Sequence, residues 1–468
     1  MKIKTAVCYS FYLNEEGTCA YLRLIAPLKQ AGISIINGVE NNRINVERIS
    51  EGDVVIIQRV LLNLEENGKY KEIIDYAHDE GKPVIFDLDD NLFNLPENQP
   101  DRPNSIYIPF LMPLLQTLIE ANLVSVSTTK LRDELAKYNS NVKVLPNYFD
   151  DNLWQFSPPL RKSSSREMLT IGYMGTPSHQ RDLEYITPVL LELSRRYPKS
   201  LRFRFWGAPP PQAIRSFIQV QFTPWYSNSH KDFVEYFQTQ AADIFIAPLE
   251  DNLFNRCKSP LKFFEYSALG APGVYSRLNC YEEFVTDGYD GLLATSLDDW
   301  TNCLVRLIEN DELRYQLADN AQNTIRENWL LSKNAFRWEE TYQSAFENQS
   351  SNRQQYNNIG GIINSINLQL TNAFIYNEAR KRELSKKWEE QDQTVQNLVN
   401  QLSQARIDVE QMAADKQSLS TQLQQARNEI DKLKAEILMY ALSMSWQITR
   451  PLRRMSRKLK KMFGATNA

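Results

Sequence analysis

The stretch ADIFIAPLEDNLFNRCKSPLKFFEYSALGAPGVYS, residues 242–276, predicts a strand, a helix and a second strand in immediate succession. Residues 242–249 are an apolar run typical of a buried strand, and residues 258–269 have helical spacing. Gly270 and Pro272 end that helix just before the apolar run 271–276. A strand, a crossover helix and a further strand form the repeating unit of a parallel α/β sheet.

The same alternation extends outward over most of the chain. Short apolar runs predict strands at 4–10, 34–39, 53–58, 83–89, 123–127 and 142–146, and again at 169–175, 201–207, 220–225, 242–249 and 271–276. Amphipathic helices are predicted between them at 19–31, 69–80, 108–121, 130–138, 182–197, 231–240 and 258–269. The segment FSPPLRKSSSRE, residues 156–167, is typical of a linker. The sequence therefore predicts two Rossmann-like doubly wound α/β domains, 1–155 and 168–348, with a ligand cleft between them.

Composition excludes several other classes of protein. The 468 residues are 42% hydrophobic, which is ordinary for a globular protein, and no apolar run is long enough to span a bilayer. The five cysteines have no CxxC pair, which predicts neither a disulfide framework nor a zinc site and favours the cytoplasm. A net charge of −4 indicates no nucleic-acid partner.

The C-terminal third has a different pattern. Residues 349–375 are polar and rich in Asn, which predicts a linker, and residues 376–445 repeat apolar side chains at three-four spacing. So thin an apolar stripe needs a partner helix, so we expect a coiled coil that forms a homo-oligomer. The alternative is a helix that folds back on the globular part of the chain.

The last segment, residues 446–468, predicts a basic amphipathic helix. Its apolar side chains keep helical spacing, while residues 441–468 contain seven Lys or Arg and no acidic residue. Such a helix is typical of binding to an anionic membrane surface, which predicts a peripheral protein at the inner face of the cell membrane. A solvated tail or one that attracts RNA is the alternative.

Cations gather at the start of the helix predicted at 258–269. Lys258, Ser259 and Lys262 lie in its first turn, where free backbone N–H groups and the helix dipole favour a phosphate or diphosphate. Glu265 lies deeper and can accept a hydrogen bond from a ribose or sugar hydroxyl.

A second phosphate-binding segment is predicted in IGYMGTPSHQRDLEYI, residues 171–186. Gly175 and Thr176 follow a strand and precede a helix, so that backbone N–H groups can approach a phosphate, and Arg181 is a further cation. For His179 the sequence leaves a ligand-binding role and an exposed loop histidine equally open.

In the first domain, PVIFDLDDNLFNLP, residues 83–96, places carboxylates at the end of a predicted central strand. One of Asp87, Asp89 and Asp90 is the candidate catalytic group that orients or deprotonates an acceptor hydroxyl. A DxD pattern also permits Mg²⁺ or Mn²⁺ bound with a diphosphate, and a helix N-cap explains at least one of the three without any ligand.

Residues 243–249, 264–274 and 287–293 together resemble the C-terminal signature of the retaining GT-B glycosyltransferases known as glycosyl transferases group 1. The resemblance extends over roughly residues 1–345, and DLDD is similar to a bacterial subset that acts on surface polysaccharides. It implies transfer of a sugar from a nucleotide diphosphate sugar to a surface-polysaccharide or lipid-linked glycan. It also implies that Glu265 binds the ribose and that the turn with Thr18 and Arg23 contacts donor phosphate or acceptor.

Two further points belong to this resemblance. GT-B enzymes generally need no cofactor, so the resemblance implies a metal-independent enzyme, although a divalent metal stays an alternative. The segment SMSWQITRPLRR, residues 443–454, resembles the ends of bacterial O-antigen or capsule assembly proteins. The chain departs from the family at Cys257, where the first of two glutamates is expected, which leaves the retaining outcome open. An inactive scaffold of a polysaccharide assembly complex and a sugar-nucleotide 2-epimerase are the alternative functions.

Overall fold

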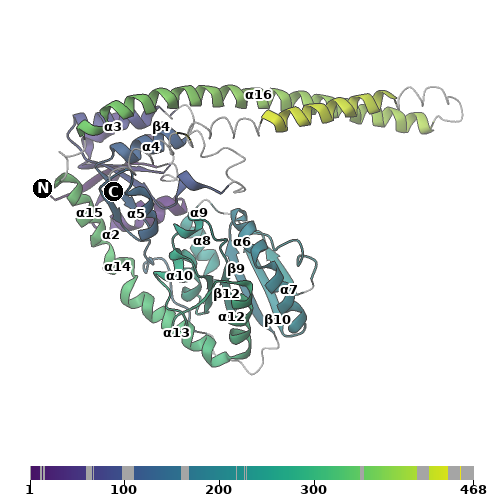
Figure 1. Cartoon of the computed structure of the whole chain (residues 1–468), viewed down its shortest axis with the longest axis horizontal. Helices are drawn as coiled ribbons and strands as arrows, with labels where there is room; N and C mark the ends of the chain where they lie inside the picture. Colours follow the sequence, from purple (N-terminus) through teal and green to yellow (C-terminus); the bar gives the residue numbers. More distant parts are fainter. Residues whose placement is uncertain are drawn as a thin grey trace. The chain divides into compact units, whose positions relative to one another are not determined.

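The structure is a computed structural model that describes residues 2–10, 13, 16–59, 66, 68–96, 110–159, 168–217, 219–225, 227, 229–347, 353–407, 421–440 and 454. The chain divides into two units, Met1–Gln99 with Pro113–Ile362 and Pro100–Met112 with Ile363–Ala468. The first unit contains both predicted α/β domains, and the second contains the C-terminal helices (Figure 1).

The first sheet is parallel, with the strand order β2-β1-β5-β6-β7-β8. Its strands are β1 (Thr5–Tyr9), β2 (Ser34–Asn37), β5 (Val54–Gln58), β6 (Val84–Leu88), β7 (Leu123–Val126) and β8 (Val142–Val144). Every position of β5 and β6 is buried, because helices cover both faces of a parallel sheet and its central strands are apolar throughout. The six strands predicted for this domain are confirmed.

The second sheet is also parallel, with the order β11-β10-β9-β12-β13-β14. Its strands are β9 (Leu169–Gly175), β10 (Leu201–Gly207), β11 (Val220–Thr223), β12 (Ile244–Ala247), β13 (Gly273–Ser276) and β14 (Leu292–Ala294). The strand β14 was not among the strands predicted from the sequence. Strand order reverses between β9 and β12, and the carboxyl edge at such a point is where open α/β sheets bind ligands.

Helices connect the strands of the first domain. They are α1 (Thr18–Ala20), the π-helix η1 (Tyr21–Ile25), α2 (Ala26–Gln30), η2 (Val46–Glu51), α3 (Lys69–Asp79), η3 (Leu92–Asn94), α4 (Leu111–Glu120) and α5 (Thr129–Leu135). A small antiparallel pair, β3 (Val39–Glu40) with β4 (Arg43–Ile44), lies between β2 and η2. The helix predicted at 19–31 is one continuous element with a π-turn inside it, and such π-turns are frequent at functional sites.

The helices of the second domain follow the same alternation. They are η5 (Pro177–His179), α6 (Gln180–Tyr185), α7 (Thr187–Arg196), α8 (His230–Phe237), α9 (Leu253–Arg256), α10 (Leu261–Ala268), α11 (Asn279–Glu282), α12 (Leu297–Glu309) and α13 (Asp311–Asn328). The predicted doubly wound α/β class is therefore confirmed for this half as well.

The last residues of the predicted second domain pack against the first domain. After α13, residue Phe149 exchanges backbone hydrogen bonds with Trp329 and Leu331, and the chain continues as α14 (Leu331–Asn334) and α15 (Phe336–Glu347). Trp338 and Tyr342 of α15 are fully buried in the core formed by η1, α2 and the first sheet. The structure thus differs from the predicted boundary at 348, because apolar side chains of α15 pack in the core of the first domain. Figure 1 shows α15 beside α2 of that domain.

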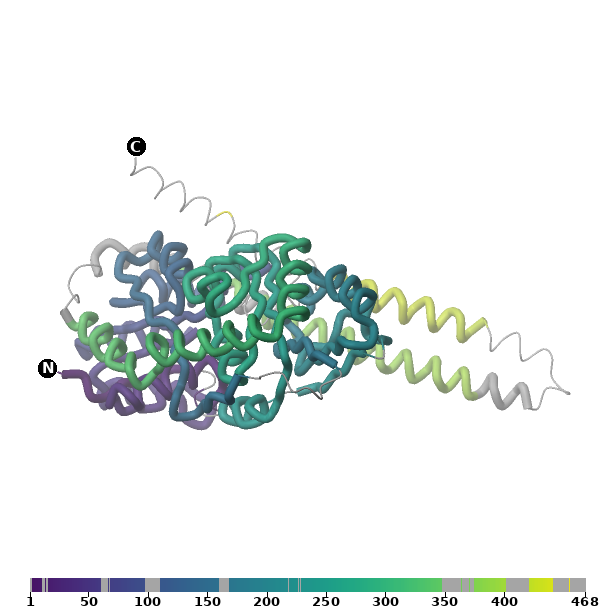
Figure 2. Tube along the Cα trace, turned by 90° about the horizontal axis from the view of Figure 1, so that it is seen from below, coloured from purple at the N-terminus to yellow at the C-terminus, as the bar shows by residue number. Residues whose placement is uncertain are grey.

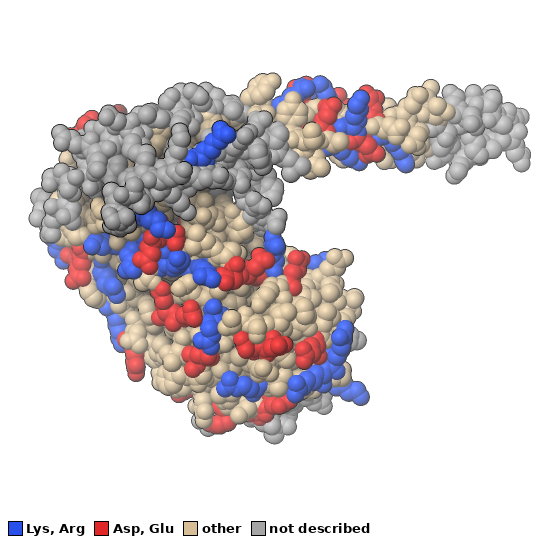
Figure 3. Space-filling model, in the orientation of Figure 1, with Lys and Arg blue, Asp and Glu red and all other residues tan. Residues whose placement is uncertain are grey.

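The second unit contains a helical hairpin. Its long helix α16 (Arg353–Ile407) begins inside the predicted linker 349–375, and a further helix covers residues 421–440. The Nζ atom of Lys434 lies 5.4 Å from the ring centre of Trp388, and Tyr440 lies near enough to Arg380 to raise its pKa, so the two helices are antiparallel neighbours. Figures 1 and 2 show them side by side, and Figure 3 shows both signs of charge interspersed along them.

Part of the predicted coiled-coil stripe is buried within this hairpin. Leu384, Val395 and Ile430 are at most 4% exposed, although the stripe was predicted to meet a second copy of the chain. Residues 408–420 and 441–445 of the predicted coiled coil lie outside the described residues, as does the basic tail 446–468 except Arg454. Within the described part of the chain, no helix combines the length and apolarity needed to cross a membrane.

Candidate functional site

The turn before α10 carries two of the predicted phosphate-binding residues. The helix begins at Leu261 and not at Lys258, because Pro260 occupies the N-cap position and leaves Lys258 and Ser259 in the preceding turn. The Nζ atom of Lys258 lies 4.7 Å from the ring centre of Phe254 in α9. Lys258 is partly buried, so its charge is held close to the carboxyl edge of β12.

The turn after β9 lies on the other side of the candidate site from Lys258. A Cβ atom at Gly175 would lie 2.4 Å from the hydroxyl oxygen of Tyr173, so this position requires glycine. Thr176 is exposed, and its hydroxyl lies 2.6 Å from that of Ser178. Arg181, in the first turn of α6, lies 3.4 Å from the carboxylate of Glu250 and is largely exposed.

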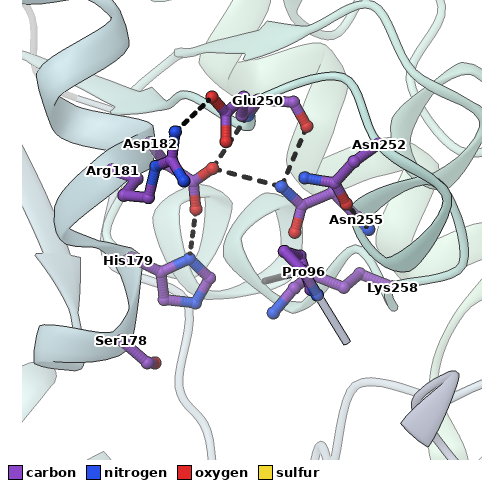
Figure 4. A pocket seen from close by; sticks show the side chains of 9 residues that line it. All are labelled: Pro96, Ser178, His179, Arg181, Asp182, Glu250, Asn252, Asn255 and Lys258. Atoms are coloured by element: carbon purple, nitrogen blue, oxygen red, sulfur yellow. Dashed lines mark hydrogen bonds and ion pairs between the residues drawn. The ribbon is translucent and has the colours of Figure 1, made fainter. Parts of the chain in front are cut away.

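These two turns line one pocket (Figure 4). It lies at the carboxyl ends of β9 and β12, where the strand order of the second sheet reverses. The first domain contributes Pro96, the last residue of the predicted aspartate segment. The lining residues are Pro96, Ser178, His179, Arg181, Asp182, Glu250, Asn252, Asn255 and Lys258.

A hydrogen-bond network centred on Asp182 fixes the walls of this pocket. One carboxylate oxygen, Oδ2, lies 2.7 Å from Nδ1 of His179. The other, Oδ1, accepts from the backbone N–H of Glu250 at 2.8 Å and from the side chain of Asn255 at 3.2 Å. Asp182 thereby ties the turn after β9 to the turn after β12, and Figure 4 shows His179 and Asp182 facing each other.

Lys262 and Glu265 form the inner part of the site on α10. The Nζ atom of Lys262 lies 5.7 Å from the ring centre of Tyr173. Burial raises the pKa of Glu265, against the effect of the Lys262 charge, and burial lowers the pKa of Lys262. Among the described residues, no hydrogen-bond donor reaches the Glu265 carboxylate. A buried carboxylate without a donor is stabilised when a ligand hydroxyl donates a hydrogen bond to it.

In the first domain, the structure places Asp87 and Arg23 in a buried ion pair. Both side chains are 0% exposed, with Arg23 Nε 3.1 Å from Oδ1 and Nη2 2.8 Å from Oδ2 of Asp87. Ser125 also donates to Oδ2 at 2.7 Å, and Arg23 donates to Asn147 at 3.2 Å. The charged groups of these two predicted site residues pair with each other and have no exposed surface. Our proposals below therefore assign both residues to the core of the domain.

The other two predicted aspartates lie closer to the surface. Arg59, which follows β5, donates to Asp89 Oδ2 at 3.2 Å and lies 3.5 Å from Asp90 Oδ2. The side chains of Asp89 and Asp90 are 12% and 24% exposed. Thr18, the first residue of α1, is exposed. Of the site residues predicted in the first domain, Thr18, Asp89 and Asp90 are the ones that a ligand can reach.

The segment 257–259 connects the two domains. The side chain of Asn91 donates to Cys257 Sγ at 3.7 Å, and the hydroxyl of Thr128 donates to the Cys257 carbonyl at 2.9 Å. Asn147 donates to the hydroxyl of Ser259 at 3.0 Å. Ser259 is therefore held at the first domain, beside the pocket, and Cys257 is buried where the family resemblance implies a glutamate.

The comparison with known protein families concerns the half that contains this pocket. The sequence model of the family described as "Glycosyl transferases group 1" matches residues 166–310. That range includes every pocket residue except Pro96. The matched segment is about a third of the chain. No protein with a curated function matches the chain.

Two solved structures are similar to this chain at the level of the fold. Anabaena HepE, in a complex with UDP and glucose, aligns with 73% of this chain and 100% of its own, with 14% identity and a TM-score of 0.50. Sucrose-phosphate synthase from Thermosynechococcus elongatus aligns with 74% of this chain and 99% of its own, with 11% identity and a TM-score of 0.52. The chain has the GT-B fold, as the sequence predicts.

The structure of the second domain adds site residues that the sequence prediction did not include. Asp182 and Asn255 form the network of the pocket, and His179, left open by the sequence, is one of its walls. The spacing of three residues between His179 and Asp182 was an available signal, since it places both on one helix face. For Asn255 the sequence contained no such signal, because its partner Asp182 lies 73 residues away.

The chemistry of the pocket favours an anion as its ligand. Of the two lining carboxylates, Asp182 is bonded to His179 and Asn255, and Glu250 is paired with Arg181. Lys258 lines the pocket without a carboxylate partner among the described residues, and Lys262 lies near enough to His179 to lower its pKa. Within the described residues, no group of three or more His, Cys, Asp or Glu side chains is placed to hold a metal ion.

Another buried histidine, His230 in α8, provides a test of pH-dependent stability. It is 2% exposed, and neither ring nitrogen has a hydrogen-bond partner. Its ring centre lies 5.0 Å from that of Tyr21 and 6.0 Å from that of Phe233. Burial lowers the pKa of His230 to about 4, so the unfolded chain binds more protons than the folded one between pH 6.5 and 4.

We therefore expect the free energy of unfolding to fall as the pH drops from 6.5 to 4. His230→Phe should reduce that loss by up to roughly 3 kcal/mol and should stabilise the protein by about 1 kcal/mol at pH 7, because it removes two unpaired buried nitrogens. Urea denaturation at pH 7 and pH 5 measures both effects. An unchanged pH dependence in the variant would contradict this account of His230.

Proposed function

We propose that the protein is a glycosyltransferase that transfers a sugar from a nucleoside diphosphate sugar to a carbohydrate acceptor. The observation that carries the proposal is the cation-lined pocket at the strand reversal of the second sheet, within the residues that match the group 1 family. Pockets at this place in open α/β sheets bind nucleotides. The HepE structure, which has the same fold, is a complex with UDP and glucose.

The residues of the pocket are suited to a departing diphosphate. We assign Lys258 and Arg181, with Lys262 behind them, to the diphosphate oxygens, and the turn with Gly175 and Thr176 to backbone contacts with the same group. Fixed cations stabilise the negative charge that develops as the sugar–phosphate bond breaks. The Glu265 carboxylate, which lacks a donor among the described residues, is assigned to the hydroxyls of the ribose.

For the acceptor we propose a surface-polysaccharide or lipid-linked glycan. Support comes from the resemblance of residues 443–454 to bacterial O-antigen and capsule assembly proteins and from the basic tail, which suits an anionic membrane surface. Asp89 and Asp90 are the first-domain carboxylates that we assign to the acceptor side, where one of them orients or deprotonates the attacking hydroxyl. Homo-oligomer formation through the C-terminal helices is part of the same proposal.

One observation favours a second candidate, an inactive scaffold of a polysaccharide assembly complex. In place of the family's first glutamate stands the buried thiol of Cys257, which accepts a hydrogen bond from Asn91. Burial raises the pKa of that thiol to about 11, so it is protonated and uncharged at neutral pH. A scaffold of this kind keeps the fold and loses both donor binding and turnover.

The test is incubation of the purified full-length chain with UDP-, GDP-, ADP- and dTDP-sugars and an extract of lipid-linked glycans, followed by mass detection of products. We expect one donor to yield a glycan heavier by one sugar residue. Epimerisation of the donor without an acceptor would favour the 2-epimerase instead. Absence of both products, together with no binding of any donor in calorimetry, would contradict the glycosyltransferase and favour the scaffold.

A further inference from the structure

His179 lies in the wall of the proposed diphosphate pocket and is held there by one strong contact. Its Nδ1 atom is 2.7 Å from Oδ2 of Asp182, and its side chain is 14% exposed. The second ring nitrogen, Nε2, has no hydrogen-bond partner among the described residues. The ring is thus fixed on one side and available to a ligand on the other.

The contact with Asp182 decides which nitrogen carries the proton. Burial alone would raise the pKa of Asp182, but hydrogen bonds from His179 and from the backbone of Glu250 hold this pKa below its usual value. The Asp182 carboxylate is therefore ionised. An ionised carboxylate only accepts, so Nδ1 of His179 is the donor. A neutral His179 therefore presents the bare lone pair of Nε2.

The surrounding charges keep His179 neutral while the pocket is free of anions. Burial, Lys258 and Lys262 lower the pKa of His179 to about 4, against the opposing effect of Asp182. The charged groups around the ring and pocket are Arg181 and Asp182 from α6, Glu250 and Lys258 from the turns after β12, and Lys262 from α10. Near pH 7 the neutral ring predominates.

A diphosphate in this pocket changes both conditions. Its oxygens are hydrogen-bond acceptors, so none of them can bond to the bare lone pair of Nε2. Its negative charge offsets the charges of Lys258 and Lys262, which otherwise disfavour a protonated ring. A proton on Nε2 would convert a repulsive contact into a charge-assisted hydrogen bond.

We propose that His179 takes up one proton from solvent when the diphosphate of a nucleoside diphosphate binds, and that Nε2–H then donates to a phosphate oxygen. Asp182 holds Nδ1–H throughout, and the proton returns to solvent when the nucleotide leaves. This inference rests on the proposed function, since it requires a diphosphate in the pocket. It makes nucleotide affinity depend on pH through one named residue.

The chain is well suited to a direct test, because it contains three histidines, His78, His179 and His230. The full-length protein, labelled with ¹³C at histidine Cε1, should give three resonances, which His78→Gln, His179→Gln and His230→Phe assign. We expect UDP, or whichever of GDP, ADP and dTDP binds, to move the His179 resonance alone to the position of a protonated imidazole at pH 7.5. Buried carboxylates such as Glu265 do not contribute to this signal.

The matched variant gives a second measurement. His179→Gln can donate an amide N–H to phosphate without taking up a proton, so its nucleotide affinity should depend less on pH. Between pH 7 and 8 we expect the affinity of the wild type to fall about tenfold more than that of His179→Gln, as uptake of about one proton requires. His78→Gln is the control, because its ring bonds to Asn122 on the first domain, away from the pocket lining.

The outcomes separate the two proposals. Protonation of His179 on nucleotide binding supports the inference. A nucleotide that binds while His179 stays neutral overturns the inference and leaves the proposed function standing. If no nucleoside diphosphate binds, as shown by calorimetry and by unchanged histidine resonances, the proposed function is contradicted and the inference with it.

Discussion

Arg23→Met is expected to lower the free energy of unfolding by about 3–5 kcal/mol. Arg23 and Asp87 are both fully buried, and their two hydrogen bonds of 2.8 and 3.1 Å neutralise each other's charge. Methionine would leave the Asp87 carboxylate buried without its cation, which is among the most costly changes in a protein core. Urea denaturation followed by tryptophan fluorescence measures the loss, since Trp338 donates a hydrogen bond to the Arg23 carbonyl.

Arg48→Met is the matched control. Arg48 pairs with Glu40 at 2.7 Å, but their side chains are 27% and 47% exposed, so its loss should cost less than about 1 kcal/mol. Adding Asp87→Asn to Arg23→Met should recover part of the stability, because the orphaned charge is then removed. If Arg23→Met were as stable as Arg48→Met yet lost nucleotide binding, the ligand-binding role predicted from sequence would be correct and the core assignment wrong.

Lys258→Met is expected to lower the turnover of sugar transfer about 100- to 1,000-fold, equivalent to about 2.7–4 kcal/mol of transition-state stabilisation. Lys258 lines the pocket in the turn before α10, where its charge faces the proposed leaving diphosphate. Methionine keeps most of the side-chain volume and removes the charge. Steady-state rates with the donor identified by the panel, together with urea denaturation, distinguish lost catalysis from lost stability.

Lys199→Met provides the comparison, because Lys199 is an exposed lysine of the same domain and lies outside the pocket lining. Its rate should be that of the wild type. Lys258→Arg keeps a cation in the turn and should retain more activity than Lys258→Met. Equal rates for Lys258→Met and the wild type would remove Lys258 from the proposed diphosphate site.

Much of the fold could be predicted because several of its strands are fully buried. β5 and β6 read as continuous apolar runs, since a parallel sheet covered on both faces requires apolar side chains at every position. The short strand β14 was missed because three residues carry too little pattern to be distinguished from a loop. The start of α10 was placed three residues too early, because charge at 258 suggested a first turn while Pro260 caps the helix.

Residues of the candidate site could be predicted where their position just after a strand was enough to indicate them. Lys258 and Arg181 were predicted from their places after a strand, and both line the pocket. Asp87 was predicted by the same reasoning, yet it is buried with Arg23, which lies 64 residues away in sequence. Nothing in the local sequence of either residue shows that the other neutralises it.

The amino-acid sequence by itself determined the α/β class and the two sheets, because periodicity and strand-end motifs are local properties of the chain. Only the tertiary structure decided that α15 completes the core of the first domain, that residues 421–440 pair with α16, and that His179 and Asp182 stand together beside Lys258. Those arrangements depend on which buried surfaces and charges meet across long sequence separations. Such pairings are set by packing and neutralisation in three dimensions, and no single segment of the chain records them.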